Sequence, residues 1–307
     1  MVEKDTSMRG SCLCGAVAYA VAGQPGPMWH CHCVSCRKLS GAAFATHVAA
    51  LAADFAWLRG QETITHYALS AVSTRSFCSH CGAVVPYAMG DGRRMVLPAG
   101  GLDDDPGVRP CAHGHVAVQA PWHTITDTLP RFITSPPDLP ACPPQSVRHQ
   151  THPRGTEGTC GSCLCGGVVY EVRGTLEVIK NCHCYRDRKM TGSAHDSCLL
   201  APASAWHGLQ GEDLLVVYSL PEAPGFRTGF CRVCGTSLPA LVPHAESLCI
   251  PAGALDNDPG ARARYHIFCG EQEKAPWFAI TDDLPQFARY APPGFDWRHP
   301  RVLGQGT

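Results

Sequence analysis

Short apolar runs separated by glycine and proline set the pattern of this chain. Residues 16–21 (AVAYAV) and 168–172 (VVYEV) are β-branched or aromatic runs that end close to a glycine, and residues 63–67 (TITHY) alternate between polar and apolar positions. Such runs predict β-strands, because successive side chains of a strand point to opposite faces of the sheet. No long amphipathic helical stripe competes with them. The pattern therefore predicts a mainly β protein built from small antiparallel sheets.

The same sequence blocks occur twice along the chain, in the same order. The block GSCLCG at residues 10–15 recurs at 161–166, and the block CHC at residues 31–33 recurs at 182–184. Three further blocks follow in both halves: FC-x-x-CG at 77–82 and 230–235, LD-x-DP at 102–106 and 255–259, and PW with TD-x-LP at 121–130 and 276–285. Five ordered matches at nearly constant spacing indicate a tandem repeat of one domain.

The repetition predicts where the domains begin and end. We expect a first copy of the domain at residues 7–134 and a second at 159–290, with a C-terminal tail at 291–307. Residues 135–158 between them are rich in Pro, Thr, His and Gln, which is typical of a linker. A length of 307 residues agrees with two domains, each large enough to bury a core of its own.

Charge and hydropathy narrow the set of partners. The chain has 25 Lys and Arg residues against 26 Asp and Glu, so it lacks the basic excess that neutralises phosphates or draws a protein to an anionic membrane. Residues 1–10 lack the apolar core of a signal peptide, and no later stretch is apolar for long enough to cross a bilayer. We therefore expect a cytoplasmic protein without a nucleic-acid or membrane partner.

Nineteen cysteines in a chain expected in the cytosol favour metal sites over disulfides, because cytosolic reductants keep thiols reduced. Each copy has a C-x-C pair just before a predicted strand and a distant C-x-x-C-G segment. Four thiolates complete the tetrahedral shell of zinc, and a closed shell of this kind is structural. The predicted ligands are Cys12, Cys14, Cys78 and Cys81 in the first copy, and Cys163, Cys165, Cys231 and Cys234 in the second.

A second cysteine cluster follows in the first copy. Cys31, Cys33 and Cys36 form a C-x-C-x-x-C motif that supplies three sulfurs and no obvious fourth ligand. Three protein ligands and an open position distinguish catalytic zinc from structural zinc. If this segment is extended, His32 points away from the face that carries Cys31 and Cys33. The alternative is a closed structural site that is completed by a histidine: His30, His32 or His47.

The charge of the three-sulfur site narrows its chemistry. Zinc bound by three thiolates carries a net charge of about −1, which weakens it as a Lewis acid compared with a three-histidine site. Such a site suits the binding of a thiol as its thiolate, because coordination deprotonates thiols and the thiolate is the nucleophile. We therefore expect a thiol substrate that adds to, or is released from, a small carbonyl carbon.

The second copy differs at this site. Asp187 stands where the first copy has Cys36, so the second cluster consists of Cys182, Cys184 and Asp187. A carboxylate oxygen binds zinc, but an ion pair with the neighbouring Arg186 or Arg188 is an equally simple use of Asp187. The sequence leaves open whether this second site holds metal.

The remaining cysteines and the basic residues beside the clusters receive simpler interpretations. Six cysteines lack a matching pair between the copies, and we expect them to be buried small apolar residues or spare thiols: Cys111, Cys142, Cys160, Cys198, Cys249 and Cys269. Two basic pairs follow the short clusters, Arg37 with Lys38 and Arg188 with Lys189. They either attract an anionic substrate or form ordinary solvated surface charge.

The ordered motifs resemble a known family. G-S-C-x-C-G, C-H-C-x-x-C-R-K, F-C-x-x-C-G, L-D-x-D-P and A-P-W with D-x-L-P-x-F are similar to the glutathione-dependent formaldehyde-activating enzymes, a family that also includes centromere protein V. The resemblance covers both copies and leaves out the linker and the C-terminal tail. It implies a β-sheet fold with one structural zinc held by four cysteines and a reactive zinc held by three. In the first copy the implied structural ligands are Cys12, Cys14, Cys78 and Cys81, and the implied reactive site is Cys31, Cys33 and Cys36.

The resemblance also implies an activity. The reaction named for that family joins formaldehyde and glutathione to S-hydroxymethylglutathione, and it is classed as a carbon–sulfur lyase reaction in reverse. We therefore expect a zinc-dependent carbon–sulfur lyase-type enzyme that acts on a glutathione or other thiol adduct of a small aldehyde. The expected cofactor is Zn²⁺, in two structural sites and one or two three-ligand sites. The alternative is a non-catalytic, zinc-stabilised binding or scaffold module.

Overall fold

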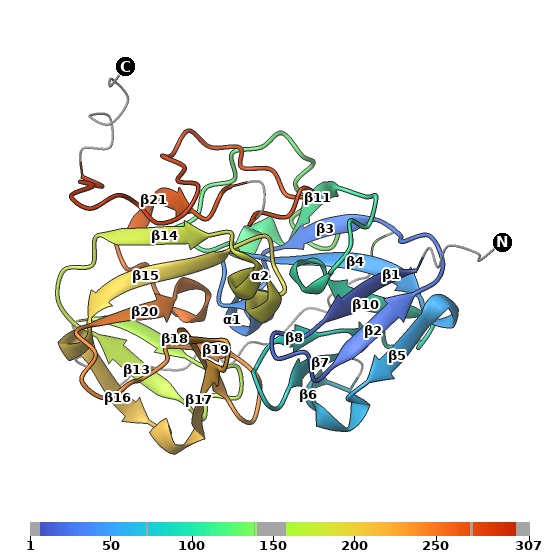
Figure 1. Ribbon diagram of the computed structural model, residues 1–307, viewed down its shortest axis with the longest axis horizontal. Coiled ribbons are helices and arrows are strands. Elements are labelled where there is room, and N and C mark those ends of the chain that lie inside the picture. The colour runs from blue at the N-terminus through green and yellow to red at the C-terminus, as the bar shows by residue number, and fades with distance from the viewer. Residues whose placement is uncertain (1–6, 72, 138, 140–157, 271–272, 299–307) are drawn as a thin grey trace.

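The computed structural model describes residues 7–71, 73–137, 139, 158–270 and 273–298. Within these ranges strands predominate, the α-helices are short, and each repeat contains three small sheets (Figure 1). The prediction of a mainly β protein is confirmed. Most of the expected linker, at residues 140–157, and the end of the expected tail, at 299–307, lie outside the described residues, so the exact domain boundaries stay a prediction.

The first repeat begins with a three-stranded sheet in the order β1 (Met8–Ser11), β2 (Ala18–Val21) and β5 (Phe55–Arg59). Its largest sheet has the order β11 (Pro110–Gly114), β3 (Met28–Cys31), β4 (Ala45–Leu51), β10 (Arg94–Pro98) and β9 (Tyr87–Ala88). The third sheet has the order β6 (Ile64–Ser70), β7 (Ser73–Cys78) and β8 (Val84–Val85). Only β11 and β3 pair in parallel; the other neighbours in these sheets are antiparallel.

The second repeat follows the same plan. Its first sheet has the order β12 (Thr159–Ser162), β13 (Val169–Val172) and β16 (Trp206–Gln210). The largest sheet has the order β20 (Ser247–Pro251), β15 (Asp196–Pro202), β14 (Val178–Cys182) and β21 (Arg262–Ile267), with β14 and β21 parallel. The third has the order β17 (Leu215–Leu220), β18 (Ala223–Cys231) and β19 (Ser237–Leu238). Among the described residues, no strand of the second repeat is equivalent to β9.

One short α-helix follows the C-H-C motif in each repeat. α1 (Val34–Ser40) begins directly after Cys33, and α2 (Tyr185–Thr191) begins directly after Cys184. Each helix ends at a glycine with positive φ, Gly41 at 76° and Gly192 at 66°. Glycine adopts this left-handed conformation without a Cβ clash, so its backbone N–H closes the last turn. The helices therefore hold the cysteine motifs at a fixed point in the fold.

The two helices lie side by side where the repeats meet (Figure 1). α1 packs against the 3-10 turn η7 (Ala252–Ala254) of the second repeat, and α2 packs against η3 (Ala99–Gly101) of the first. The backbone N–H of Gly100 donates to the carbonyl of Gly192 at 3.0 Å. A Cβ at Gly100 would clash with the backbone of Ser193, so only glycine allows this approach.

Two buried lysines join the repeats. Lys38 Nζ donates to Asp256 Oδ1 at 2.6 Å and to Ser162 Oγ at 2.9 Å, although both partners belong to the second repeat. The side chain of Lys189 makes the reciprocal contacts with the first repeat, including Asp103 Oδ1 at 2.6 Å. Lys38 is 3% exposed and Lys189 is 0% exposed. The sequence offered two interpretations of these basic residues: attraction of an anionic substrate, or solvated surface charge. Both are therefore wrong for the two lysines.

The hydrophobic core is continuous across the two repeats. One cluster of buried residues contains side chains from both, including Trp122 of the first repeat and Trp277 of the second. In a second shared cluster, the rings of Phe77 and Phe230 meet edge to face with their centroids 6.1 Å apart. The repeats thus bury much of their apolar surface against each other and not only in separate cores. Among the described residues, every helix is too short or too polar to span a bilayer.

Candidate metal centres and the cavity between the repeats

Four cysteine sulfurs meet in the first repeat. Cys12 and Cys14 lie in the turn between β1 and β2, whereas Cys78 and Cys81 flank the turn between β7 and β8. The four sulfurs lie within 4.8 Å of one another, with 3.5 Å between Cys12 and Cys14 and 3.8 Å between Cys14 and Cys78. Zinc with Zn–S bonds of about 2.3 Å sets the sulfurs of a tetrahedron about 3.8 Å apart. The spacing therefore fits a tetrahedral ion and is too long for disulfides.

The second repeat builds the same cluster. The sulfurs of Cys163 and Cys165 are 3.3 Å apart, and those of Cys165 and Cys231 are 3.8 Å apart. Cys234 completes the group, whose four sulfurs again lie within 4.8 Å of one another. The backbone N–H of Val168 points at the Cys163 sulfur from 3.2 Å and stabilises negative charge there. Each repeat thus places four soft donors at one point, as a metal ion such as zinc requires.

A smaller group of donors forms around Cys36. The sulfurs of Cys31 and Cys36 and a ring nitrogen of His47 lie within 4.8 Å of one another, and Cys36 Sγ is 3.5 Å from His47 Nε2. Cys33 lies outside this group of mutual neighbours, and its sulfur is 3.3 Å from Ser35 Oγ. The structure therefore groups two of the three predicted cysteines with His47, and the third, Cys33, packs in the same buried cluster.

The three histidines considered as a fourth ligand have different surroundings. His30 shares a hydrogen bond of 3.0 Å with Thr46 Oγ1, and His32 shares one of 2.8 Å with His113. His47 alone of the three joins the described cysteine group. It lies on β4, which pairs with β3, and the antiparallel register sets it beside the strand that ends in Cys31.

Arg75 is a neighbour of this site that sequence reasoning missed. Its guanidinium Nη2 is 3.8 Å from Cys36 Sγ, and the group stacks over the Tyr87 ring at 4.5 Å. The side chain is 3% exposed, so its positive charge acts in a medium of low dielectric constant. In the second repeat the equivalent position is Thr228, just as Asp187 replaces Cys36. Arg75 and Cys36 are thus both replaced in the second copy. This shared difference could have linked them from sequence, but only if the two positions were known to be close in space.

The second repeat keeps only part of the smaller cluster. Cys182, Cys184 and Asp187 have donor atoms within 4.8 Å of one another, and the Cys184 thiol donates to Asp187 Oδ2 at 3.2 Å. Among the described residues, neither neighbouring arginine pairs with Asp187: Arg188 donates to the Gly100 carbonyl, and Arg186 stacks on Phe226. Asp187 therefore belongs to the cysteine group and not to an ion pair with Arg186 or Arg188.

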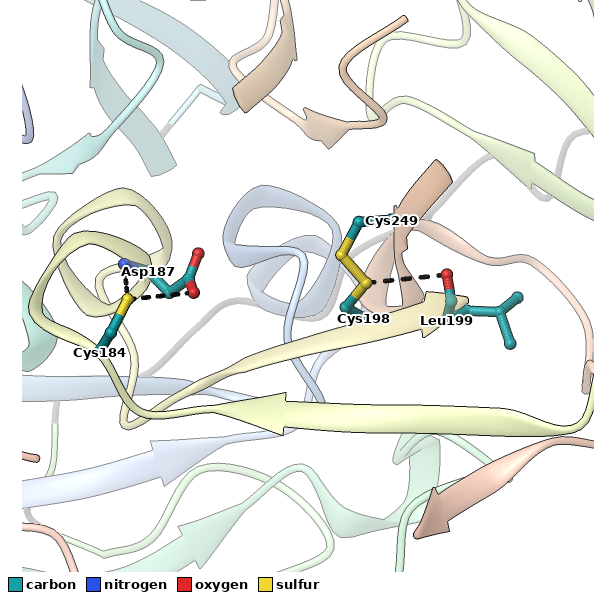
Figure 2. Close-up of a disulfide and its surroundings, with 5 residues drawn as sticks. All are labelled: Cys184, Asp187, Cys198, Leu199 and Cys249. Atoms are coloured by element: carbon teal, nitrogen blue, oxygen red, sulfur yellow. Dashed lines mark hydrogen bonds between the residues drawn. A yellow bond between two sulfur atoms is a disulfide. The ribbon is translucent and has the colours of Figure 1, made fainter. Parts of the chain in front are cut away.

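A disulfide stands where the first repeat has His47. The equivalent residue Cys198 is bonded to Cys249 across β15 and β20, with 5.4 Å between the Cα atoms, and Figure 2 shows this bond apart from Cys184 and Asp187. The expectation of spare or merely packed thiols is therefore wrong for Cys198 and Cys249. Two cysteines on neighbouring strands reach bonding distance only through the sheet register, which spacing along the chain does not show. Of the others, Cys160 is buried, Cys111 is exposed, Cys269 is half-buried, and Cys142 lies outside the described residues.

A chain of hydrogen bonds links Asp127, His113 and His32 in the first repeat. Asp127 accepts from His113 Nε2 at 2.9 Å, and Nδ1 of the same ring lies 2.8 Å from His32 Nε2. Burial lowers the pKa of His113, so the ring is neutral and its Nδ1 accepts the proton of His32 Nε2. This order leaves Nδ1 of His32 unprotonated, and that buried atom has no hydrogen-bond partner among the described residues.

The second repeat contains the equivalent chain from Asp282 through His266 to His183. The distances are 3.0 Å and 2.8 Å, and Nδ1 of His183 is again buried without a partner in the described part of the protein. Sequence analysis placed the two aspartates in a repeated block but gave them no role. It did not identify the two histidines that contact them, His113 and His266. Their recurrence before the Pro-Trp block was the signal that could have found them.

Both of these hydrogen-bonded chains, Asp127–His113–His32 and Asp282–His266–His183, border a cavity of about 280 Å³ between the repeats. Thr126 and Thr281, which are equivalent residues, meet at its edge with 2.6 Å between their hydroxyl oxygens. Apolar side chains such as Phe44, Trp122 and Phe278 form much of the remaining wall. Concave sites of this size, with apolar walls and a few polar groups, are where proteins bind small molecules.

Two imidazoles that line this cavity, the buried His195 and the half-buried His123, should make the protein sensitive to acid. Burial lowers the pKa of His123 to about 4 and that of His195 to about 3, whereas unfolded histidine titrates near 6.5. Because the unfolded state binds more protons, stability should fall as the pH drops from about 6.5 toward 4, by up to about 1.4 kcal/mol per pH unit for each histidine. Urea unfolding at pH 7, 6 and 5 measures this slope. His123→Phe, which installs the equivalent Phe278, should reduce it; an unchanged slope would contradict the assignment.

The sequence model described as glutathione-dependent formaldehyde-activating enzyme matches residues 7–118 and again residues 159–271. No curated protein matches the chain significantly. A solved crystal structure of a Rhodobacter sphaeroides protein is 22% identical over 31% of this chain and 85% of that chain; its TM-score of 0.26 is too low to support an argument. Because the two matched segments make up most of the chain, the protein belongs to the glutathione-dependent formaldehyde-activating enzyme family and carries two tandem copies of the family's domain.

Proposed function

We propose that the first repeat carries a zinc-dependent carbon–sulfur lyase-type centre that acts on a glutathione or other thiol adduct of a small aldehyde. The observation that carries this proposal is the group of Cys31, Cys36 and His47, with the guanidinium of Arg75 3.8 Å from Cys36 Sγ. Membership of the family supports the same substrate class. The second repeat, with Asp187 for Cys36 and Cys198 for His47, is proposed to be inactive in this reaction.

The donors at Cys36 suit zinc. Two sulfurs and an imidazole nitrogen match the ligand types that zinc prefers, and Cys33 is close enough in sequence to join them. When bound there, zinc would hold an incoming thiol as the nucleophilic thiolate. Four thiolates would fill all coordination positions of a tetrahedral zinc ion and leave none for a substrate, so we propose that the four-cysteine groups are structural.

The chain's own residues contribute charge and enclosure. The buried Arg75 guanidinium favours negative charge on the sulfurs near it, because an adjacent cation stabilises a thiolate. In the direction of synthesis, the thiol sulfur forms a bond to the carbonyl carbon, and the carbonyl oxygen receives the proton that the thiol gives up. The reverse reaction breaks the same carbon–sulfur bond and returns the aldehyde and the thiol.

A second candidate function is a non-catalytic module in which all bound zinc is structural. The space beside Cys36 has a volume of only about 10 Å³, which is room for about one water molecule. Thr191 and Gly192 of the second repeat form part of its wall, so a thiol reaches Cys36 only if this wall moves. The small enclosed space therefore favours a structural zinc site, whereas the three donors and the nearby Arg75 favour a catalytic one.

Two measurements separate these functions. Zinc X-ray absorption should show an additional sulfur ligand when glutathione is added, and formation of S-hydroxymethylglutathione from formaldehyde should be accelerated. Cys36→Ser should reduce that rate by about 10²-fold or more, whereas Asp187→Ala, its counterpart in the second repeat, should leave the rate unchanged. An unchanged zinc spectrum together with equal rates for the two variants would reject the enzyme and favour the structural module.

A further inference from the structure

The cavity between the repeats is separate from every cysteine cluster. Residues of both repeats form its wall, and none of the described lining residues is a cysteine. On β3 the cavity is bordered by His30, whereas the next residue, Cys31, packs into a different cluster with Trp29 and Cys36. Successive strand residues point to opposite faces, so the cavity and the Cys36 site lie on opposite sides of the same sheet.

The cavity lies between equivalent elements, yet its two halves carry different side chains. Three pairs of equivalent positions differ: His30 and Asn181, Phe44 and His195, and His123 and Phe278. Other pairs are unchanged, such as Asp127 and Asp282. Packing between two copies of one domain does not require such differences. Because of these differences, the polar groups of the wall are not related by the symmetry of the repeat. An asymmetric molecule would therefore fit the cavity in a single orientation.

His123 offers hydrogen-bonding groups to that space. The half-buried ring contacts Phe44 with 5.5 Å between the centroids and His32 with 5.8 Å, but it makes no hydrogen bond with the described residues. Its nitrogen atoms are therefore available to a molecule in the cavity. A ligand that bonds to this imidazole and contacts the Phe44 ring would use both the polar and the apolar part of the wall.

The charged side chains of the wall already have partners inside the protein. Asp127 accepts from His113, Asp282 accepts from His266, and Arg262 pairs with Asp258 at 2.8 Å. A charged ligand would lose its hydration without finding a free counter-ion, and that loss is costly. An uncharged ligand avoids this cost. We therefore expect the cavity to bind uncharged molecules more tightly than glutathione, which is an anion.

We propose that the cavity between the repeats is a binding site for an uncharged small molecule with an aromatic part and a hydrogen-bonding group, held by His123 and the rings of Phe44, Trp122 and Phe278. The site is independent of the cysteine clusters. Both copies of the domain supply its wall.

Calorimetric titration of the zinc-loaded protein with phenol tests this site, with benzoate and benzylammonium as charged controls of similar size. We expect saturable binding of one phenol per chain, at least about tenfold tighter than either charged control. His123→Phe should weaken phenol binding by about tenfold, as expected for one lost hydrogen bond. Ala279→Trp, at an exposed position of the cavity wall, should block binding, whereas Val118→Trp, exposed and outside the wall, should not.

Circular dichroism and zinc content confirm that each variant is folded. Absence of saturable phenol binding, equal binding of the three probes, or unchanged binding in His123→Phe would each overturn the proposal. Cys36→Ser should bind phenol as the parent does. The result for the cavity therefore does not depend on whether the first repeat is an enzyme.

Discussion

Replacing Cys81 with serine is expected to remove one bound metal ion and to unfold the first repeat. Its sulfur is fully buried and belongs to the group formed with Cys12, Cys14 and Cys78. Structural zinc contributes about 10–16 kcal/mol of apparent binding energy in small zinc domains, which matches or exceeds the whole stability of a typical domain, about 5–15 kcal/mol. Metal analysis of the purified protein and thermal unfolding followed by circular dichroism measure the effect.

The chain supplies a control for this experiment. Cys111 is exposed and lies outside the metal groups found among the described residues, so Cys111→Ser should retain the full metal content and melt as the parent does. Cys81 also packs in the cluster that contains Phe230 of the second repeat. Its loss should therefore destabilise both repeats. A Cys81→Ser protein with unchanged metal content and melting temperature would show that the four sulfurs hold no ion.

Replacing Lys38 with alanine is expected to destabilise the protein by about 3–5 kcal/mol, the usual cost of breaking a buried ion pair. The change leaves the carboxylate of Asp256 and the hydroxyl of Ser162 without the ammonium group that joins them across the repeats. Asp256 is mostly buried, so water replaces the lost partner only in part. The midpoint of urea unfolding, with the slope checked for two-state behaviour, gives the change in free energy.

Two matched variants make this prediction specific. Lys189→Ala breaks the reciprocal pair, but its partner Asp103 is more exposed than Asp256, so the loss should be smaller. Arg109→Ala removes an exposed pair with Asp105 and should cost less than about 1 kcal/mol. If Lys38→Ala lowered the free energy of unfolding no more than Arg109→Ala, the buried lysines would not stabilise the contact between the two repeats.

Several features of this protein follow from its sequence alone. The tandem repeat is visible because its blocks recur in order, and the strands are visible because alternation is a local property of the chain. The four-cysteine groups are predictable for a similar reason. In C-x-C and C-x-x-C the backbone itself holds each pair of sulfurs close together, so Cys12 with Cys14 and Cys78 with Cys81 need only one long-range meeting. Local spacing and the order of the repeated blocks are therefore enough to predict these features.

Tertiary structure alone decided the rest. Spacing along the chain does not show the contact of Arg75 with Cys36, the bond between Cys198 and Cys249, or the contact of Lys38 with Asp256. The sequence named His47 only as one of three candidate histidines, and folding placed that one beside Cys36. The cavity between the repeats is of the same kind, because each copy supplies only part of its wall. Sheet register and the packing of one repeat on the other set these distances, and they arise only when the whole chain has folded, because no local motif encodes which surfaces will face each other.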